Sequence, residues 1–172
     1  APWWRTPENP PAELNPTAAI AGLLLKHRVD HPWVVEAESF CWQAVAQSET
    51  NQYHDLMPMI TFLENAPDRS RAGHELERLA ARIRERELVA MDTAAQGYVQ
   101  KPLDWAPTPG AYLRQLFSDE VIAEHLAWME SCQQEDGGWP ITWQPVSPAV
   151  EMEWRSQRTL HALNTLRAYG VL

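Results

Sequence analysis

The chain has 172 residues, 45% of them apolar, which is enough for one domain with a hydrophobic core. Its 14 basic and 23 acidic residues give a net charge of -9, which repels phosphate backbones and disfavours nucleic acid as a partner. No apolar run approaches the ~20 residues that span a bilayer, the first residues lack a signal-peptide pattern, and the two cysteines make no disulfide framework, so we expect a cytoplasmic protein.

The amino-terminal part predicts an extended arm followed by a helix. Residues 1–15 contain four prolines, which favour extended backbone. Asn15 is a capping residue type, and Pro16 suits the first position of a helix. The expected buried residues of this helix include Ala18, Leu23 and Leu24.

Two further helices are expected before residue 67. In the stretch 31–47, apolar side chains recur at helical spacing at Val34, Ala37, Cys41 and Ala44. The stretch 53–66 predicts the next helix, which Pro58 should kink or delay because proline lacks an N–H group.

The stretch 71–89 predicts an amphipathic helix. One side carries Leu76, Leu79, Ile83 and Leu88. The other side is charged, with oppositely charged pairs three residues apart at Glu75/Arg78 and Arg82/Glu85. A partner could bind this face, but a solvated outer surface is the better interpretation.

Residues 90–117 interrupt the helical pattern with two glycines and three prolines. So long an irregular segment in a compact domain predicts a lid or a binding loop. Ser118 then caps a helix with two apolar stripes, made by Ile122, Leu126 and Met129 and by Val121, Trp128 and Cys132. The last helix should run from Ser147 and Pro148 to Gly170, with Leu160, Leu163 and Leu166 along it.

Helices with a charged face alternate with helices that carry few charges, and no stretch shows a convincing strand pattern. Two concentric layers of helices require this alternation, because the outer layer exposes one face and the inner layer buries most of its surface. The sequence therefore predicts an all-α fold.

Tryptophan occurs nine times, at positions 3, 4, 33, 42, 105, 128, 139, 143 and 154. Large aromatic side chains most often fill a helical core. The alternative is an aromatic-walled cavity for an apolar, cationic or sugar ligand.

The stretch WMESCQQEDGGW resembles the Gln-Trp repeat of squalene-hopene and oxidosqualene cyclases. Its aromatic, aliphatic, glutamine and Gly-x-Trp positions are filled by Trp128, Met129, Gln133, Gly137 and Trp139. The basic residue expected upstream is missing. The whole chain resembles the carboxy-terminal part of bacterial proteins with prenyltransferase/squalene-oxidase repeats, in the terpenoid cyclase/protein prenyltransferase-like superfamily.

This resemblance implies helical hairpins that form part of an α/α toroid, here as a single domain. The superfamily has five to seven hairpins and this chain offers about three, so the ring would be incomplete. A second copy of the chain, or a missing amino-terminal half, would then complete it. Trp3 and Trp4 could lie at that seam.

The turn around Asp136 is interpreted as structural. In the cyclases the repeat's glutamine is thought to bind free amides at the next helix start while its tryptophan stacks on the preceding helix. Helix ends do carry unsatisfied amides, and the adjacent glycines permit a tight reversal. Asp136 is expected to serve the same turn.

Asp104 and Glu153 are the candidate catalytic carboxylates. Class II terpene cyclases use an Asp-x-Asp-Asp motif, which is absent here, so Asp104 beside Trp105 is the first choice for a remaining acid. The alternative is an aspartate that holds a loop through backbone hydrogen bonds. Glu153 with Asp104 could form a carboxylate pair of the kind used in glycoside hydrolysis.

A zinc site like that of protein prenyltransferases is not expected. Cys132 and His161 lack the matching partners, and His27 and His31 lie four residues apart without a third ligand. No metal or other cofactor is implied.

The predicted function is binding of a small apolar, isoprenoid-like or cationic ligand in an aromatic, acidic cavity. Two alternatives stay open, namely an isoprenoid cyclase or transferase completed by residues outside this chain and a structural half-toroid. Helix starts face the cavity in a toroid, so the resemblance implies that Glu151, Trp154 and Arg155 line it. Trp105 and Trp143 are the other expected ligand-binding residues. Glu151 and Arg155 could also form an ordinary ion pair on one helix.

Overall fold

The computed structural model describes residues 8–172. In that range it has seven α-helices, one 3-10 helix and no strand, so the all-α prediction is confirmed. The chain divides into two compact units, one ending at Leu79 and the other spanning Ala80–Leu172. None of the helices within residues 8–172 combines the length and apolar content needed to cross a bilayer.

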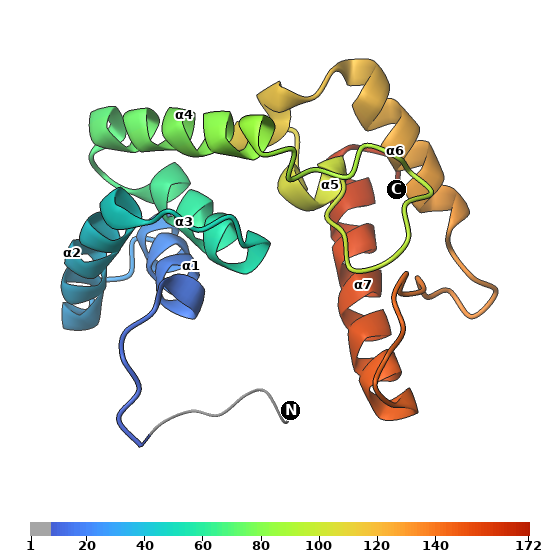
Figure 1. Ribbon diagram of the computed structural model, residues 1–172, viewed down its shortest axis with the longest axis horizontal. Helices are drawn as coiled ribbons and strands as arrows, with labels where there is room; N and C mark the ends of the chain where they lie inside the picture. The colour runs from blue at the N-terminus through green and yellow to red at the C-terminus, as the bar shows by residue number, and fades with distance from the viewer. Residues whose placement is uncertain (1–7) are drawn as a thin grey trace. The chain divides into compact units, whose positions relative to one another are not determined.

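In the first unit α1 (Leu14–Lys26) packs against α2 (Pro32–Gln47) and, most extensively, against α3 (Tyr53–Asn65) (Figure 1). Its core side chains are almost fully buried and come from all three helices; they include Ala18, Ala21, Cys41, Leu56, Met59 and Phe62. Trp42 meets Phe62 edge to face, with 5.1 Å between ring centroids. The burial of this surface gives the helices, which are short on their own, most of their stability.

The start of α4 (Arg69–Glu85) is fixed by arginines that bind the ends of the preceding helices. Arg69 donates to the carbonyls of Leu63 and Ala66, and Arg78 donates to the carbonyl of Val45 at 2.7 Å. The last carbonyls of a helix have no intrahelical partner, so cationic side chains there are stabilising.

Several local predictions for this unit are confirmed. Asn15 has extended dihedral angles (φ -102°, ψ 117°), so regular helical backbone starts at Pro16. The Glu75–Arg78 pair forms at 2.7 Å. Residues 8–13 are not helical, whereas the rest of the predicted arm, with Trp3 and Trp4, lies outside the described residues.

One prediction for this unit is wrong, and another is decided only in part. Pro58 does not delay α3, which begins at Tyr53 and contains this buried proline, so the kink alone stays a prediction. Leu23 was expected in the core but is 48% exposed. The reason is that α1 uses its small residues, Ala18, Ala21 and Gly22, for its closest contacts.

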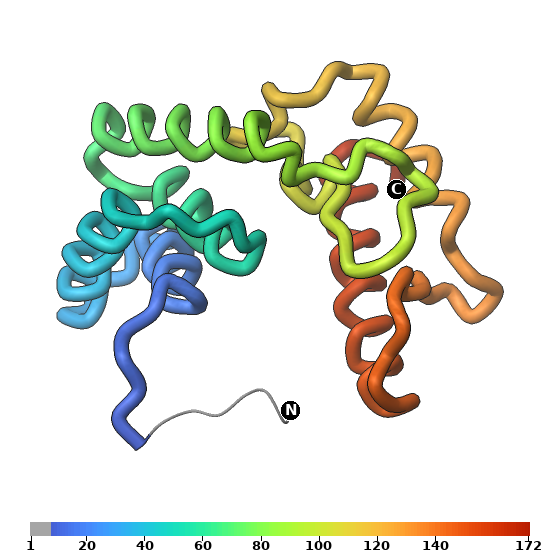
Figure 2. The backbone as a smooth tube through the Cα atoms, viewed as in Figure 1, coloured from blue at the N-terminus to red at the C-terminus, as the bar shows by residue number. Residues whose placement is uncertain are grey.

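The second unit contains α5 (Pro102–Trp105), the 3-10 helix η1 (Tyr112–Leu116), α6 (Asp119–Ser131) and α7 (Pro148–Ala168). Helix α6 contacts α5 and α7. Figure 2 shows the chain between α4 and α5 as a wide loop without helix, as predicted for much of 90–117.

The helix ends of this unit also follow the sequence. The Ser118 hydroxyl accepts from the Val121 amide and the Ser147 hydroxyl from the Val150 amide, so both serines are N-caps. The predicted apolar stripe of α7 is only partly buried. Leu166 is 1% exposed, whereas Leu160 and Leu163 are 56% and 40% exposed, because the neighbouring segments cover only one side of the helix.

Gly22 provides a test of the α1–α3 packing. A Cβ at this position would lie 2.5 Å from the Thr61 carbonyl oxygen, whereas a Cβ at Gly73 on α4 would meet nothing within 4 Å. Gly22→Ala is expected to lower the free energy of unfolding by about 1–3 kcal/mol through overpacking. Gly73→Ala should raise it by about 0.5–1 kcal/mol, because alanine favours the helix over glycine. Urea unfolding followed by circular dichroism measures both, and equal effects would contradict this packing.

Candidate functional site

The second unit encloses a pocket of about 240 Å³. Four separate stretches line it: residues 96–104, α6, residues 139–143 and α7. Its walls include the indoles of Trp128, Trp139 and Trp143, and its charged lining residues are Lys101, Asp104 and Arg158.

Two larger hollows of about 480 and 410 Å³ differ from this pocket in their lining. Their charged or apolar walls include exposed side chains, such as Glu87 and Met91 in one and Met152 and Leu160 in the other. They are open surface hollows, so the tryptophan-walled pocket is the candidate site.

Asp104 connects α5 to α7 at the base of the pocket. It is 7% exposed, and one carboxylate oxygen accepts from the Lys101 amide at 2.8 Å, which caps α5. The other oxygen accepts from Arg158 Nη1 at 2.8 Å and lies 3.4 Å from His161 Nε2. A buried carboxylate is stable only when it is paired and hydrogen-bonded, so these contacts explain how Asp104 stays in the interior.

Lys101 is a second buried charge in the pocket wall, and the whole residue is 6% exposed. Its amino group donates to the Thr93 carbonyl and lies 3.7 Å from the ring centroid of Trp128. Burial lowers the pKa of Lys101, and the nearby Asp104 carboxylate opposes that effect. The indole face and the carbonyl hold this cation in place, and neither of these two contacts is an ion pair.

Two histidines lie near these charges. His125 is 2% exposed and its Nε2 lies 3.0 Å from the Met91 carbonyl oxygen. Burial lowers the pKa of both His125 and His161, and Asp104 opposes the shift in each case. Both imidazoles are therefore favoured in their neutral form in the folded protein.

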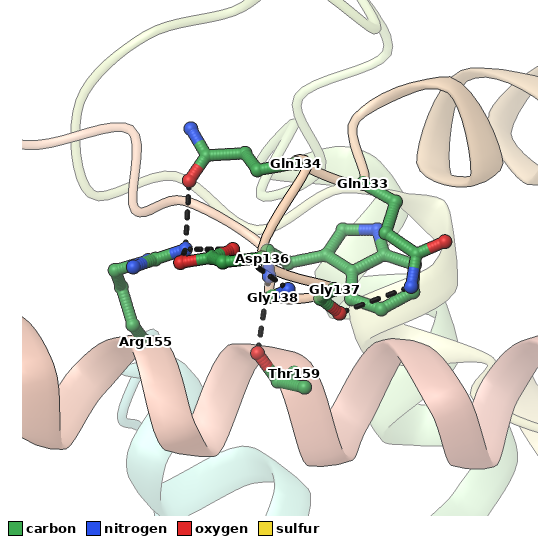
Figure 3. A network of polar contacts seen from close by, with 8 residues as sticks. Gln133, Gln134, Asp136, Gly137, Gly138, Arg155 and Thr159 are labelled. Atoms are coloured by element: carbon green, nitrogen blue, oxygen red, sulfur yellow. Dashed lines mark hydrogen bonds and ion pairs between the residues drawn. The ribbon is translucent and has the colours of Figure 1, made fainter.

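The turn between α6 and α7 is held by its own polar contacts (Figure 3). The Gly138 amide donates to Asp136 at 3.0 Å, and Arg155 from α7 bridges Asp136 and Gln134. The hydrogen bonds from the Gly138 amide and from Arg155 lower the pKa of Asp136. Gly137 has a φ of 81°, which glycine adopts without strain.

Trp139 fastens this turn to both helices. Its indole N–H donates to the Met129 carbonyl of α6 at 2.6 Å, and its backbone amide donates to the Thr159 hydroxyl of α7 at 3.0 Å. The residue is 5% exposed. The expected packing of this tryptophan on the preceding helix is therefore present.

Gln133 has a different role from the one the resemblance implied. Its side-chain amide donates to the Gly137 carbonyl at 3.0 Å, inside the same turn (Figure 3). The start of α7 lies further along the chain and is capped by Ser147, eight positions after Trp139. The turn consequently meets the middle of α7, at Arg155 and Thr159.

An aromatic cluster continues one wall of the pocket. Tyr98, Trp143 and Trp154 meet edge to face, with ring centroids 4.8, 5.4 and 6.0 Å apart. The Gly97 amide and the Thr142 carbonyl form a hydrogen bond beside it, so the irregular segment is tied to the turn before α7. This cluster connects three segments that are far apart in the sequence.

The structure brings some predicted site residues together. Asp104, Trp128, Trp139 and Trp143 line one pocket. Trp154 touches that wall through Trp143. Arg155 lines the open hollow on α7 and binds Asp136.

The remaining predicted residues lie elsewhere. Trp105 is 1% exposed and belongs to the core rather than to the pocket lining. Glu151 and Glu153 are exposed on α7 and are not among the lining residues. Positions 153 and 158 lie about 140° apart around an α-helix, so a glutamate at 153 faces away from the Asp104 partner.

Sequence reasoning missed Lys101 and Arg158, which supply the positive charge of the pocket. The stretch KPLD did contain a signal, because proline at the first and aspartate at the third helical position mark a helix start. Arg158 carried no such signal, since its partner Asp104 lies 54 residues away.

Within residues 8–172 no three His, Cys, Asp or Glu side chains gather as a metal site would require. Cys41 and Cys132 are free thiols. In comparisons with protein-family models, curated proteins and solved structures, nothing matches this chain.

Replacing Trp139 tests the attachment of the turn. Trp139→Phe should lower the free energy of unfolding by about 1–2 kcal/mol, because a buried hydrogen bond and part of an aromatic ring are lost. Trp154→Phe is the matched control in the same unit, since Trp154 is 36% exposed, and should change the free energy by less than about 0.5 kcal/mol. Similar losses in urea unfolding would show that Trp139 has no special structural role.

The buried histidines predict a pH dependence of stability. Their pKa values in the folded state lie below the ordinary 6.5, so the unfolded chain binds protons first as the pH falls. The free energy of unfolding should therefore be highest above pH 6.5 and decrease below it. His125→Gln should flatten this decrease, whereas His27→Gln at an exposed position should not. An unchanged slope in His125→Gln, measured by urea unfolding between neutral and mildly acidic pH, would contradict the assignment.

Proposed function

We propose that the Ala80–Leu172 unit binds a small, largely apolar ligand in the tryptophan-walled pocket. The observation that carries the proposal is the lining itself, in which three indoles surround a cavity with a few fixed charged groups. Small-molecule sites typically combine apolar and aromatic walls with a small number of placed polar groups.

The size of the pocket limits the ligand. Drug-sized ligands occupy cavities of about 300–1,000 Å³, whereas this pocket has about 240 Å³. The ligand class that fits is therefore a single-ring or short-chain compound, smaller than a triterpene.

The charge of the lining differs from the acidic cavity predicted from the sequence. Lys101 and Arg158 contribute two cationic groups against the single carboxylate of Asp104. A cationic ligand would meet like charge there, so a neutral or anionic ligand is preferred.

We also propose that α6, the turn and α7 form one repeat of the prenyltransferase/squalene-oxidase kind. The contact of the Trp139 indole with the Met129 carbonyl of α6 supports this proposal. The alternative of an isoprenoid cyclase or transferase has less support. Asp104 is already bound to Arg158 and to the Lys101 amide, and the pocket would need volume from outside this chain.

A structural half-toroid is the second candidate. It is favoured by the apolar side chains that α7 exposes, since Met152, Leu160 and Leu163 are 59%, 56% and 40% exposed and share one side of the helix. This surface is separate from the pocket lining, so the two functions could coexist.

Filling the pocket tests the binding function. Ala162 is 2% exposed and lines the pocket, so Ala162→Leu would occupy part of it. A fragment set of small aromatic compounds, followed by ligand-observed NMR, should show binders to the wild type whose affinity falls at least about tenfold in this variant.

Ala168→Leu is the matched control, because Ala168 lies on the same helix and is exposed. It should leave the affinities unchanged. Binders that respond equally to both variants, or an absence of binders to the wild type, would contradict the proposed function.

A further inference from the structure

The pocket holds two cations in fixed positions, one at the start of α5 and one on α7. Lys101 is 6% exposed, and its amino group is held by the Thr93 carbonyl and the face of Trp128. Arg158 is anchored from α7 by one guanidinium nitrogen, Nη1, at 2.8 Å from Asp104. Both side chains line the pocket.

Lys101 and Arg158 together have more N–H donor groups than the carboxylate of Asp104 binds. A guanidinium has five N–H groups in a planar fork, and an ammonium has three. Arg158 binds Asp104 through Nη1, and the amino group of Lys101 contacts a neutral carbonyl and an indole. One positive charge is therefore in excess among the charged groups of the lining.

We propose that the ligand of this pocket carries one carboxylate group, which Lys101 and Arg158 bind while its apolar body packs against the tryptophans. The inference rests on the proposed function, because it assigns the chemical class of the ligand at the same site. Charge-assisted hydrogen bonds to a carboxylate are among the strongest in proteins, and a guanidinium matches carboxylate geometry.

A monoanion fits better than a phosphate. A single negative charge balances the one excess positive charge, whereas a dianionic phosphate would leave a net negative charge beside the buried Lys101 and Asp104. The volume of about 240 Å³ also favours a compact head group with a single ring.

The pre-arranged cations make the site ready for such a ligand. Asp104 fixes the guanidinium of Arg158, and Trp128 fixes the ammonium of Lys101, so little side-chain entropy is lost on binding. Lys101 and Asp104 are 6% and 7% exposed, and this burial strengthens the electrostatic attraction.

Three single-ring probes of similar size test the head group on the wild-type protein. Benzoate carries a carboxylate, benzamide is neutral with nearly the same shape, and benzylamine is cationic. Isothermal titration calorimetry should find benzoate at least about tenfold tighter than benzamide, with benzylamine weakest, as expected for charged hydrogen bonds. Benzamide binding as tightly as benzoate would overturn the inference.

Variants assign the effect to the two cations. Lys101→Met should weaken benzoate at least about tenfold and leave benzamide nearly unchanged. Arg158→Met also removes the partner of Asp104, so it should weaken both probes, and benzoate more than benzamide. Arg167→Met is the control, because Arg167 is exposed on the same helix as Arg158. If either pocket variant fails to fold by circular dichroism, the comparison of probes on the wild type still decides the inference.

The outcomes separate this inference from the proposed function. If benzoate and benzamide bind equally and both are lost in Ala162→Leu, the pocket binds ligands but the carboxylate assignment is wrong. If neither probe binds at millimolar concentration, both proposals fail. Benzoate binding that is unaffected by Lys101→Met and Arg158→Met would place the anion elsewhere and would also overturn the assignment.

Discussion

Asp104 occupies the position on which the Ala80–Leu172 unit depends. The segment before α5 has no helical periodicity, so it cannot attach itself to the unit by a regular apolar face. Besides the Gly97–Thr142 and Met91–His125 contacts, its attachment comes from the Asp104 carboxylate at its end, which accepts from the Lys101 amide and from Arg158 of α7. A carboxylate that is 7% exposed loses much of its hydration, and the fixed donors compensate for this loss. The same contacts place both cations in the wall of the pocket.

The turn between α6 and α7 supplies the opposite wall. The Trp139 indole is directed to the Met129 carbonyl, and its backbone amide binds Thr159. Trp143 follows in the same stretch and meets Tyr98 of the irregular segment. The pocket thus lies where two segments attach to α7. The irregular segment attaches through the Asp104–Arg158 ion pair, and the turn attaches through Trp139. This arrangement explains why aromatic walls and fixed cations occur together.

The sequence predicted the local features best. Caps and apolar periodicity depend on residues within a few positions, so Ser118, Ser147 and Gly170 marked the helix ends correctly. The indole at Trp139 was correctly expected to pack on the preceding helix. Asp104 was the first choice for a remaining acid, with a loop-holding aspartate as the alternative, and its bond from the Lys101 amide is of the kind that the alternative expects. The long-range partners were not predictable, because nothing in the local pattern indicates that Arg158 faces a residue 54 positions earlier. Burial along α1 and α7 was predicted only in part. Helical spacing shows which apolar residues share one side of a helix, but not which part of that side other segments cover. Leu23 and Leu160 are therefore exposed although both lie at apolar positions of the pattern.

A double-mutant cycle between Asp104 and Arg158 tests the central claim most directly. The free energies of unfolding of the wild type, Asp104→Asn, Arg158→Met and the double variant give the coupling energy of the pair. If this contact organises the unit, the coupling should be about 1–3 kcal/mol, the range of residues within one buried network. A coupling within about 0.5 kcal/mol of zero, as for independent sites, would contradict the account and remove the structural basis of the pocket.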